Sequence, residues 1–393
     1  MTGNLAELFL LDPEVRFLNH GSYGACPAEV FATYQAWQRQ LERQPVAFLD
    51  PARGYGAWMR DARVALGAEL GADPDDLVGV QNATVGLNIV AQSLALQPGD
   101  EILTTDHEYN ALEKTWAYVA LRTGAVIKTV TVPLPLVDAA EFTSVIIDGI
   151  TDRTRVLFLS HITSATALLF PIENAVQQAR QRGIWTVIDG AHVPGHIALD
   201  LTALGADFYA GNCHKWLMAP KGSAFLHVRR DLQPLITPLV ISHGWTPDRA
   251  NPAPFGNSPF IDALEMQGTR DPAAWLSVPA AITFRHDHGW DRVAATCTAL
   301  VQDTAKRVAR RTGLTPLSSP RFCAPQMVSM PIPPCEPLVL QKALRDTYRI
   351  EIPVFRWKDR HIARLSVQGY NTAAEMDVLV TGLTALLALP ARG

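Results

Sequence analysis

The segment WTVIDGAH, residues 185–192, decides the fold class of this chain. Four largely apolar residues precede Asp189, which is the pattern of a short buried strand that ends in a carboxylate. Six other short runs of apolar and β-branched residues resemble it, at residues 77–81, 100–105, 126–132, 155–161, 207–211 and 223–228. Helix-like segments with three- and four-residue apolar spacing lie between the early runs, at residues 84–96, 110–123, 138–150 and 172–182. Buried strands that alternate with amphipathic helices predict an α/β domain with a mostly parallel sheet.

The alternation of strand-like and helix-like segments ends after about residue 239. Residues 242–260 hold four prolines and two glycines and are expected to form a loop. A helix-rich segment follows at 272–311, then a strand-and-turn stretch with three prolines, then an amphipathic helix near 373–389. These features predict a second, smaller α+β domain. We therefore divide the chain into an N-terminal segment (1–15), a large α/β domain (16–260) and a small domain (261–393).

Composition and charge exclude several classes of protein. Hydrophobic residues at 48% and charged residues at 18% are typical of a folded globular chain. Lysine and arginine total 34 against 38 acidic residues, a net charge of −4, which argues against a nucleic-acid-binding protein. The longest uncharged stretch, 77–99, is too polar for a membrane span, and the first residues lack the features of a signal peptide. Five scattered cysteines without CxxC spacing argue against a disulfide framework or a zinc site and favour a cytoplasmic protein.

Polar residues crowd the ends of five predicted strands, at positions 82–84, 107–110, 161–164, 189–192 and 212–215. Ligands of open α/β sheets bind outside the carboxyl ends of the strands. Five strands that deliver polar side chains to one edge are hard to explain by solubility alone. We therefore expect a ligand site at this edge.

Each of these residues has an alternative structural interpretation. Asp189 is either a helix N-cap or a carboxylate partner for a cationic ring nitrogen, and His192 either contacts a ligand oxygen or is a partly buried histidine. Lys215 lies between His214 and Trp216, where a desolvated amine with a lowered pKa suits Schiff-base chemistry. Lys221, in a Pro-Lys-Gly turn, is the competing lysine and is expected to be solvated.

The turn at residues 81–86, QNATVG, runs from a strand into a helix. It is either an ordinary N-cap or an anion site built from backbone N–H groups and the Thr84 hydroxyl. A phosphate cup, an aspartate for a pyridine nitrogen and a Schiff-base lysine are together what pyridoxal phosphate requires. The chain resembles the class V aminotransferase family of fold-type I pyridoxal-phosphate enzymes, in its isopenicillin N epimerase-like branch. The resemblance runs from FLNHGSYGACP at 17–27 to ARLSVQGYNT at 363–372 and includes DGAHVPGHIALDL and GNCHKW.

The resemblance implies a seven-stranded large domain, a small C-terminal domain and roles for individual residues. Lys215 would bind the cofactor covalently and act on the Cα proton, Asp189 would pair with the pyridine nitrogen, and His192 would contact the phenolic oxygen. Tyr109 would stack on the ring and assist catalysis, although an alignment shifted by two residues favours His107. The resemblance further implies that the phosphate is bound by Ala83, Thr84, Asn212 and His214 and by a partner subunit's Thr269, which requires a homodimer. It also implies that the substrate is bound by Arg364, Asn19, His20 and Tyr23.

Other chemistries are less well supported. The chain contains no GxGxxG, GxxxxGK[ST], GxSxG or HExxH motif. The cluster His286-Asp287-His288 is more typical of a solvated helix end than of a metal site, and no metal is predicted. Cys335, in a Pro-Pro-Cys-Glu-Pro setting, has no thiolate activator, which disfavours a cysteine desulfurase.

The reaction itself is left open by these motifs. Epimerisation, β-elimination and transamination of an amino acid share one Cα carbanion, and epimerisation needs a second proton donor, such as Tyr109 or His20. We favour an epimerase or a β-eliminating lyase, with an aminotransferase as the alternative. A catalytically silent ligand-binding relative is disfavoured because Asp189, Lys215 and Arg364 are all present.

Overall fold

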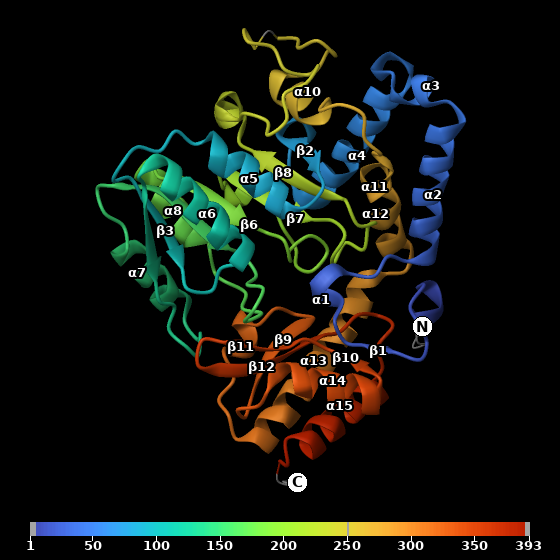
Figure 1. The fold of residues 1–393 in the computed structure, drawn as a ribbon, viewed down its shortest axis with the longest axis vertical. Helices are drawn as coiled ribbons and strands as arrows, with labels where there is room; N and C mark the ends of the chain where they lie inside the picture. Colours follow the sequence, from blue (N-terminus) through green and yellow to red (C-terminus); the bar gives the residue numbers. More distant parts are fainter. Residues whose placement is uncertain (1–4, 250, 390–393) are drawn as a thin grey trace.

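The computed structural model describes residues 5–249 and 251–389 and consists of a large and a small domain (Figure 1). Within these residues, the large domain contains a seven-stranded sheet of order β2-β8-β7-β6-β5-β3-β4. Its strands are β2 (Leu77–Val80), β3 (Glu101–Thr105), β4 (Val126–Val130), β5 (Thr154–Ser160), β6 (Trp185–Asp189), β7 (Phe208–Asn212) and β8 (Ala224–Val228). Only β8 runs antiparallel to its neighbours β2 and β7. The predicted mostly parallel seven-stranded sheet is confirmed.

Alternation along the strands explains the three-layer arrangement. On β5, Val156 and Phe158 belong to one apolar cluster, whereas Leu157 and Leu159 belong to the cluster on the opposite face. One face is covered by α5 (Ala83–Ser93), α6 (Asn110–Thr123) and α10 (Pro259–Glu265). The other is covered by α4 (Tyr55–Leu70), α7 (Ala139–Asp148), α8 (Glu173–Gln181) and α12 (Val278–Asp287).

Further helices complete the large domain. They are η1 (Leu5–Leu8), α1 (His20–Tyr23), α2 (Ala28–Arg43), α3 (Pro45–Leu49), η2 (Pro51–Arg53), η3 (Pro74–Asp76), α9 (Leu201–Leu204), η4 (Arg230–Leu235) and α11 (Ala273–Leu276). The helices α11 and α12 pack against α2 and α4, and α10 packs against β2. Residues 242–249 and 251–258 are irregular, as predicted, whereas the last two residues of the predicted loop already belong to α10, which has Ser258 as its N-cap.

The small domain has its own apolar core. The antiparallel sheet β11-β12-β9 packs against three helices. The elements are α13 (Trp290–Thr312), η5 (Pro320–Phe322), β9 (Met327–Ile332), α14 (Pro337–Tyr348), β10 (Ile350–Glu351), β11 (Val354–Trp357), β12 (Arg360–Ser366) and α15 (Ala373–Leu386). Thr372 and Glu375 form a capping box that fixes the start of α15. This domain carries β12 to the edge of the large domain.

The start of the chain is joined to the small domain. Strand β1 (Arg16–Phe17) pairs in parallel with β10, and Leu18 belongs to the apolar core of the small domain. In Figure 1, β1 accordingly lies beside the orange and red elements, and α1 follows it toward the large domain. The division of the chain at residues 15 and 260 stays a prediction, and residues 1–4 of its first segment lie outside the described part. Within the described ranges, no helix is both long and apolar enough to cross a bilayer.

Candidate active site

Lys215 lies in the turn that follows β7, at the carboxyl edge of the sheet. Its Nζ is 2.9 Å from Nε2 of His192. The pKa of Lys215 is lowered to about 7, mainly by burial and also by the nearby Arg364 cation, while the Asp189 carboxylate opposes this shift. An amine that deprotonates near neutral pH can act as a nucleophile or as a base. The structure thus gives Lys215 the environment that its predicted role requires.

Asp189 is the last residue of β6 and is buried. Its carboxylate accepts one hydrogen bond, from the amide of Ala191 at 2.9 Å. Burial raises the pKa of Asp189 to about 6, and the hydrogen bond and the Lys215 cation oppose this rise. The N-cap interpretation is not met, because the next helix, α9, begins at Leu201 and is capped by Asp200. A buried carboxylate with one partner retains acceptor sites for a cationic ring nitrogen.

His192 lies between the amine of Lys215 and the indole of Trp216. The Trp216 Nε1–H donates to Nδ1 of His192 at 3.3 Å. Burial, together with the cations Lys215 and Arg364, holds the pKa of His192 well below its ordinary value. The imidazole is therefore neutral and is held in place from both sides.

The predicted anion site lies at the amino terminus of α5. The amide of Ala83 donates to Oδ1 of Asn212 at 2.8 Å, and the amide of Val85 donates to Oδ1 of Asn82 at 2.9 Å. Asn82 is thus the N-cap, whereas the amide and hydroxyl of Thr84 have no partner among the described residues. His214 donates from Nδ1 to the carbonyl oxygen of Ser223 at 3.3 Å. Free donors at a helix amino terminus fit a phosphate group.

Arg364 comes from β12 of the small domain and is buried. Its Nη1 donates to the carbonyl oxygen of Ser164 at 2.6 Å, and its Nη2 donates to Oγ of Ser22 at 2.9 Å. Its Nε is buried and has no partner in the described part of the chain. Burial lowers the pKa of Arg364 to about 10, so the side chain stays cationic at neutral pH. A guanidinium with unused donors beside Lys215 suits a substrate carboxylate.

The predicted N-terminal contacts divide into two kinds. Asn19 accepts a 2.6 Å hydrogen bond from Ser22 and so orients a partner of Arg364, while Tyr23 is 72% exposed near the same guanidinium. The two ring nitrogens of His20 are instead 2.9 Å from the Tyr370 hydroxyl and 3.0 Å from the carbonyl oxygen of Lys215. Neither nitrogen is left for a substrate or for proton donation, in contrast to the expectation from the sequence. His20 instead connects the small domain to the backbone of Lys215.

Tyr109 and His107 have different environments. Tyr109 directly precedes α6, is 44% exposed, and its phenol interacts electrostatically with Arg364. His107 is buried, with its ring 4.6 Å from Trp357 and its Nδ1 2.8 Å from Oγ1 of Thr166. Tyr109 therefore lies on the open side of the site, which favours it as the stacking residue. The stacking itself stays a prediction.

Thr269 is exposed on the surface of the single chain. It lies in an irregular segment beyond α10, and no backbone hydrogen bond among the described residues joins it to Lys215 or to α5. This position is compatible with a contribution to a second subunit. The assignment stays a prediction.

The sequence analysis missed four residues that shape the site. Ser22 and Ser164 hold the guanidinium of Arg364, and Trp216 holds His192. The fourth, Glu108, is buried and accepts hydrogen bonds from Thr105 at 2.6 Å and from the hydroxyl of Ser160, the register partner of Asp189, also at 2.6 Å. Burial raises the pKa of Glu108 to about 8. Ser164 and Glu108 fall within the polar strand-end segments, which was the available signal.

Two other kinds of site receive no support. All five cysteines are free, and burial raises the pKa of each thiol, so none is an activated thiolate. His286 lies 3.7 Å from Glu69, and within residues 5–249 and 251–389 no group of three His, Cys, Asp or Glu side chains is placed to bind a metal.

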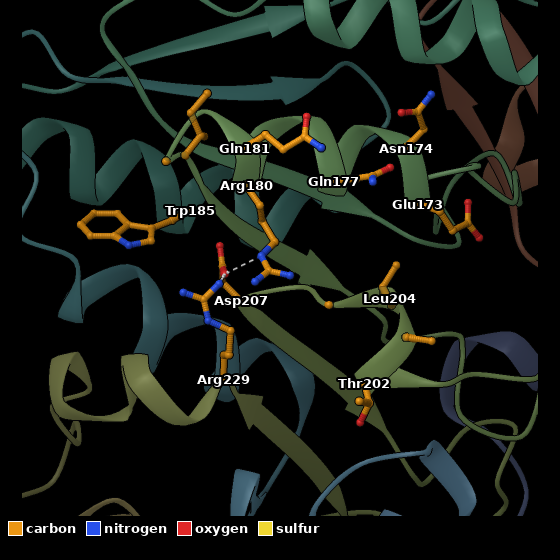
Figure 2. Close-up of a pocket in the computed structure, with 14 residues that line it drawn as sticks. Glu173, Asn174, Gln177, Arg180, Gln181, Trp185, Thr202, Leu204, Asp207 and Arg229 are labelled. Carbon is orange, nitrogen blue, oxygen red and sulfur yellow. Dashed lines mark hydrogen bonds and ion pairs between the residues drawn. The ribbon is translucent and has the colours of Figure 1, made fainter.

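A hollow of about 980 Å³ lies elsewhere on the chain. Trp185, Asp207 and Arg229 line it, at the amino ends of β6 and β7, away from Asp189 and Lys215. Figure 2 shows Arg180 and Arg229 directed at the carboxylate of Asp207. Arg229 pairs with this carboxylate and with Asp231, and Arg180 faces the same carboxylate, so these charged groups already have partners and the size of the hollow does not mark the reactive site.

Comparison with known proteins agrees with this geometry. The family model described as aminotransferase class-V matches residues 27–379. The chain belongs to this family. Over 385 residues it is 36% identical to isopenicillin N epimerase of Streptomyces clavuligerus, with 96% of each chain covered. It is 29% identical to a probable chloroplastic L-cysteine desulfhydrase of Arabidopsis thaliana, with 88% of this chain and 75% of that protein covered.

The fold comparison leads to the same family. The crystal structure of the cysteine desulfurase CsdA from Escherichia coli superposes with a TM-score of 0.82 at 23% identity and covers 98% of each chain. The fold is thus that of the fold-type I pyridoxal-phosphate enzymes. This class V protein is a pyridoxal-phosphate-dependent enzyme of the isopenicillin N epimerase-like branch. The unpartnered donors of Thr84 and the incompletely partnered carboxylate of Asp189 fit that cofactor.

Proposed function

We propose that the enzyme epimerises the α-carbon of an amino-acid substrate. The observation that carries this proposal is the placement of a readily deprotonated amine, Lys215, beside a buried guanidinium, Arg364, that has an unused donor. The guanidinium binds the α-carboxylate and so fixes the α-carbon near the amine. The similarity to an isopenicillin N epimerase over nearly the whole chain supports the same type of reaction.

When bound, pyridoxal phosphate supplies an electron sink that makes the Cα proton acidic. Nζ of Lys215 accepts that proton on one face, and the hydroxyl of Tyr109 donates a proton on the other. The net change is inversion at Cα, with one proton removed and one added. The phenolate and the ammonium left at the end then exchange protons with water through the open side of the site, where Tyr109 is 44% exposed.

β-Elimination is the second candidate. It begins with the same loss of the Cα proton, and the 29% identity to a probable L-cysteine desulfhydrase supports it. Transamination is the third and would need Lys215 to return the proton to the cofactor carbon rather than to Cα. The three reactions differ in what becomes of the substrate, so product analysis separates them.

The test incubates the holoenzyme with isopenicillin N and with L- and D-amino acids in deuterium oxide. Chiral chromatography and mass spectrometry then report the configuration and the deuterium content at Cα. Inversion with one deuterium and no oxo acid is the expected result. Pyruvate with ammonia or sulfide from cysteine, an oxo acid without elimination, or unchanged substrate throughout would each overturn the epimerase proposal.

We further propose a homodimer in which Thr269 of each chain completes the phosphate site of the other. Its exposure in the single chain supports this arrangement. Mixed Lys215→Ala and Thr269→Ala chains are expected to recover activity, because a heterodimer has one site with both lesions and one with neither. A Thr269→Ser chain serves as the control, since it retains the hydroxyl. Absence of recovery in proven heterodimers would contradict a shared site.

We also propose that the enzyme works in the cytoplasm. The five cysteines are all unpaired in the structure, and three of them are partly exposed. Free thiols persist in a reducing compartment. Fractionation of the source cells, with the enzyme followed by antibody, tests this location, and recovery in a secreted fraction would contradict it.

A further inference from the structure

Trp216 forms hydrogen bonds that the reaction described above does not use. The indole is fully buried, and its Nε1–H donates to Nδ1 of His192 at 3.3 Å. An indole nitrogen can donate a hydrogen bond but cannot accept one. Nδ1 of His192 must therefore carry a lone pair.

The proton of His192 is then assigned by elimination. The ring is neutral, because burial and the cations Lys215 and Arg364 hold the pKa of His192 well below its ordinary value. A neutral imidazole has one N–H, and Nδ1 does not carry it, so the proton lies on Nε2. Nε2 is the atom that lies 2.9 Å from Nζ of Lys215.

This tautomer of His192 determines the protonation state of Lys215. A donor at Nε2 needs an acceptor at Nζ, and an ammonium group has no lone pair to offer. The contact is therefore satisfied only when Lys215 is a neutral amine. The other groups that face this pair act on the same equilibrium, with Arg364 favouring the neutral amine and Asp189 favouring the ammonium.

The surroundings of Trp216 hold its indole in the donating orientation. Its ring stacks on His196, with centroids 3.9 Å apart and planes inclined by 20°. His196 is fixed in turn, because the amide of Gln326 donates to its Nε2 at 3.0 Å while its Nδ1 meets the carbonyl oxygen of His192 at 3.0 Å. The carbonyl oxygen of Trp216 accepts from Arg285 at 3.1 Å.

We propose that Trp216 is a positioning residue that fixes His192 in the Nε2–H tautomer and thereby keeps Lys215 in its neutral, reactive form. The catalytic consequence rests on the proposed function, whereas the tautomer does not. Replacement of the indole by a phenyl ring removes the donor but keeps an aromatic ring on His196. His192 can then adopt the Nδ1–H tautomer, in which the lone pair on Nε2 accepts a hydrogen bond from Lys215 and so favours its ammonium form.

The first measurement needs no variant. In the intact chain labelled with ¹⁵N-histidine, long-range ¹H–¹⁵N spectra report which ring nitrogen of His192 is protonated, with a His192→Gln chain used for assignment. Protonation at Nε2 is expected. Protonation at Nδ1 would overturn the proposal even if every Trp216 variant failed to fold.

The second measurement compares Trp216→Phe with Trp290→Phe. Trp290 is the matched control, because it is equally buried and donates from Nε1 to Oε1 of Gln368 at 3.2 Å, outside the Lys215 site. The cofactor is removed, the amine is acylated across pH, and the labelled Lys215 peptide is quantified by mass spectrometry. Trp216→Phe should raise the midpoint by about one pH unit, the equivalent of one hydrogen bond, and Trp290→Phe should leave it unchanged.

An unchanged midpoint in Trp216→Phe, or an equal shift in both variants, would overturn the proposal. Neither measurement uses a substrate. A wrong assignment of the reaction therefore leaves the tautomer result intact, and a wrong tautomer leaves the epimerase assay intact. The two proposals can fail separately.

Discussion

Two buried aspartates on neighbouring strands, Asp189 and Asp207, have opposite surroundings. Asp189 ends β6 at the carboxyl edge of the sheet, whereas Asp207 directly precedes β7 at the amino edge. Both are nearly inaccessible, at 4% and 2% exposure. Asp207 accepts hydrogen bonds from the amide and the hydroxyl of Thr186 at 2.8 and 3.1 Å and pairs with Arg229, with Arg180 3.6 Å away (Figure 2). Among the described residues, Asp189 accepts a hydrogen bond only from the amide of Ala191.

The difference shows how a functional carboxylate is recognised. Burial is similar at the two positions, and the hollow of about 980 Å³ lies beside Asp207. Only the unmet hydrogen-bonding capacity separates them, because a carboxylate with all its partners in place has nothing to offer a ligand. If unmet hydrogen-bonding capacity marks a functional carboxylate, substitutions around Asp189 should impair activity, and substitutions around Asp207 should impair stability instead.

Loss of Lys215, the amine beside Asp189, should have the largest effect. Lys215→Ala should lose the covalent bond to the cofactor and at least roughly 10⁴-fold of kcat, because nucleophile and base disappear together. Borohydride reduction followed by peptide mapping locates the bond. Lys221→Ala is the control, since Nζ of Lys221 donates to the carbonyl oxygen of Gly24 at 3.0 Å. A cofactor label on Lys221 would reverse the assignment.

Replacement of the two aspartates by asparagine tests the comparison directly. Asp189→Asn should bind the cofactor through the α5 site yet exchange the substrate Cα proton with deuterium oxide roughly 10²–10³-fold more slowly, since it loses a preorganised charge. Asp207→Asn should exchange at the wild-type rate. The unfolding free energy of Asp207→Asn in urea should instead fall by roughly 2 kcal/mol. This is less than the cost of breaking a fully buried ion pair, because Arg229 is partly exposed. Equal exchange rates in the two variants would break the comparison.

Arg364→Lys should have an intermediate effect. The charge is kept, but the planar fork that reaches Ser22 and Ser164 and leaves Nε free is lost. We expect kcat/KM to fall about 10–100-fold, corresponding to one charge-assisted hydrogen bond, with most of the change in KM. Arg229→Lys at the other edge is the control and should leave kcat/KM unchanged. A wild-type KM for Arg364→Lys would remove Arg364 from substrate binding.

The smallest effect concerns the pH dependence of stability. Burial raises the pKa of Asp189 from 3.8 to about 6, so between these values the native chain holds more protons than the unfolded chain. The stability contributed by the protonated group is therefore present below about pH 4 and lost as the pH rises through about 6. Relative to Asp189→Asn, the cofactor-free wild type should lose roughly 2 kcal/mol of unfolding free energy between pH 4 and 7 in urea unfolding. A difference that does not vary with pH would contradict the raised pKa.

The sequence was sufficient to predict the sheet and the residues at its carboxyl edge. Most of the strands are short apolar runs with polar residues at or just after their ends, so Asp189 and Lys215 could be found from local pattern alone. The side chains that contact these residues could not be predicted from local pattern. Ser22 reaches Arg364 from 342 residues away, and this contact depends on how the small domain meets the large one.

Local pattern also left some side chains undecided. Tyr109 and His107 are two residues apart on one loop, and tertiary contacts such as those of His107 with Trp357 and Thr166 distinguish their surroundings. Similarly, nothing in the segment around His20 indicates that both of its ring nitrogens are engaged within the protein. Such tertiary contacts have no local signal in the sequence.

The pairing of β1 with β10 has a consequence for synthesis on the ribosome. Arg16 and Phe17 emerge early, but their partners Ile350 and Glu351 are translated more than 300 codons later. At a synthesis rate of about 5–20 residues per second, β1 stays without its partner strand β10 for tens of seconds. The segment that follows β1, with His20 and Ser22, can therefore reach its final place beside Lys215 and Arg364 only near the end of translation. The nascent chain is thereby kept from assembling a complete active site until almost all of it has been made.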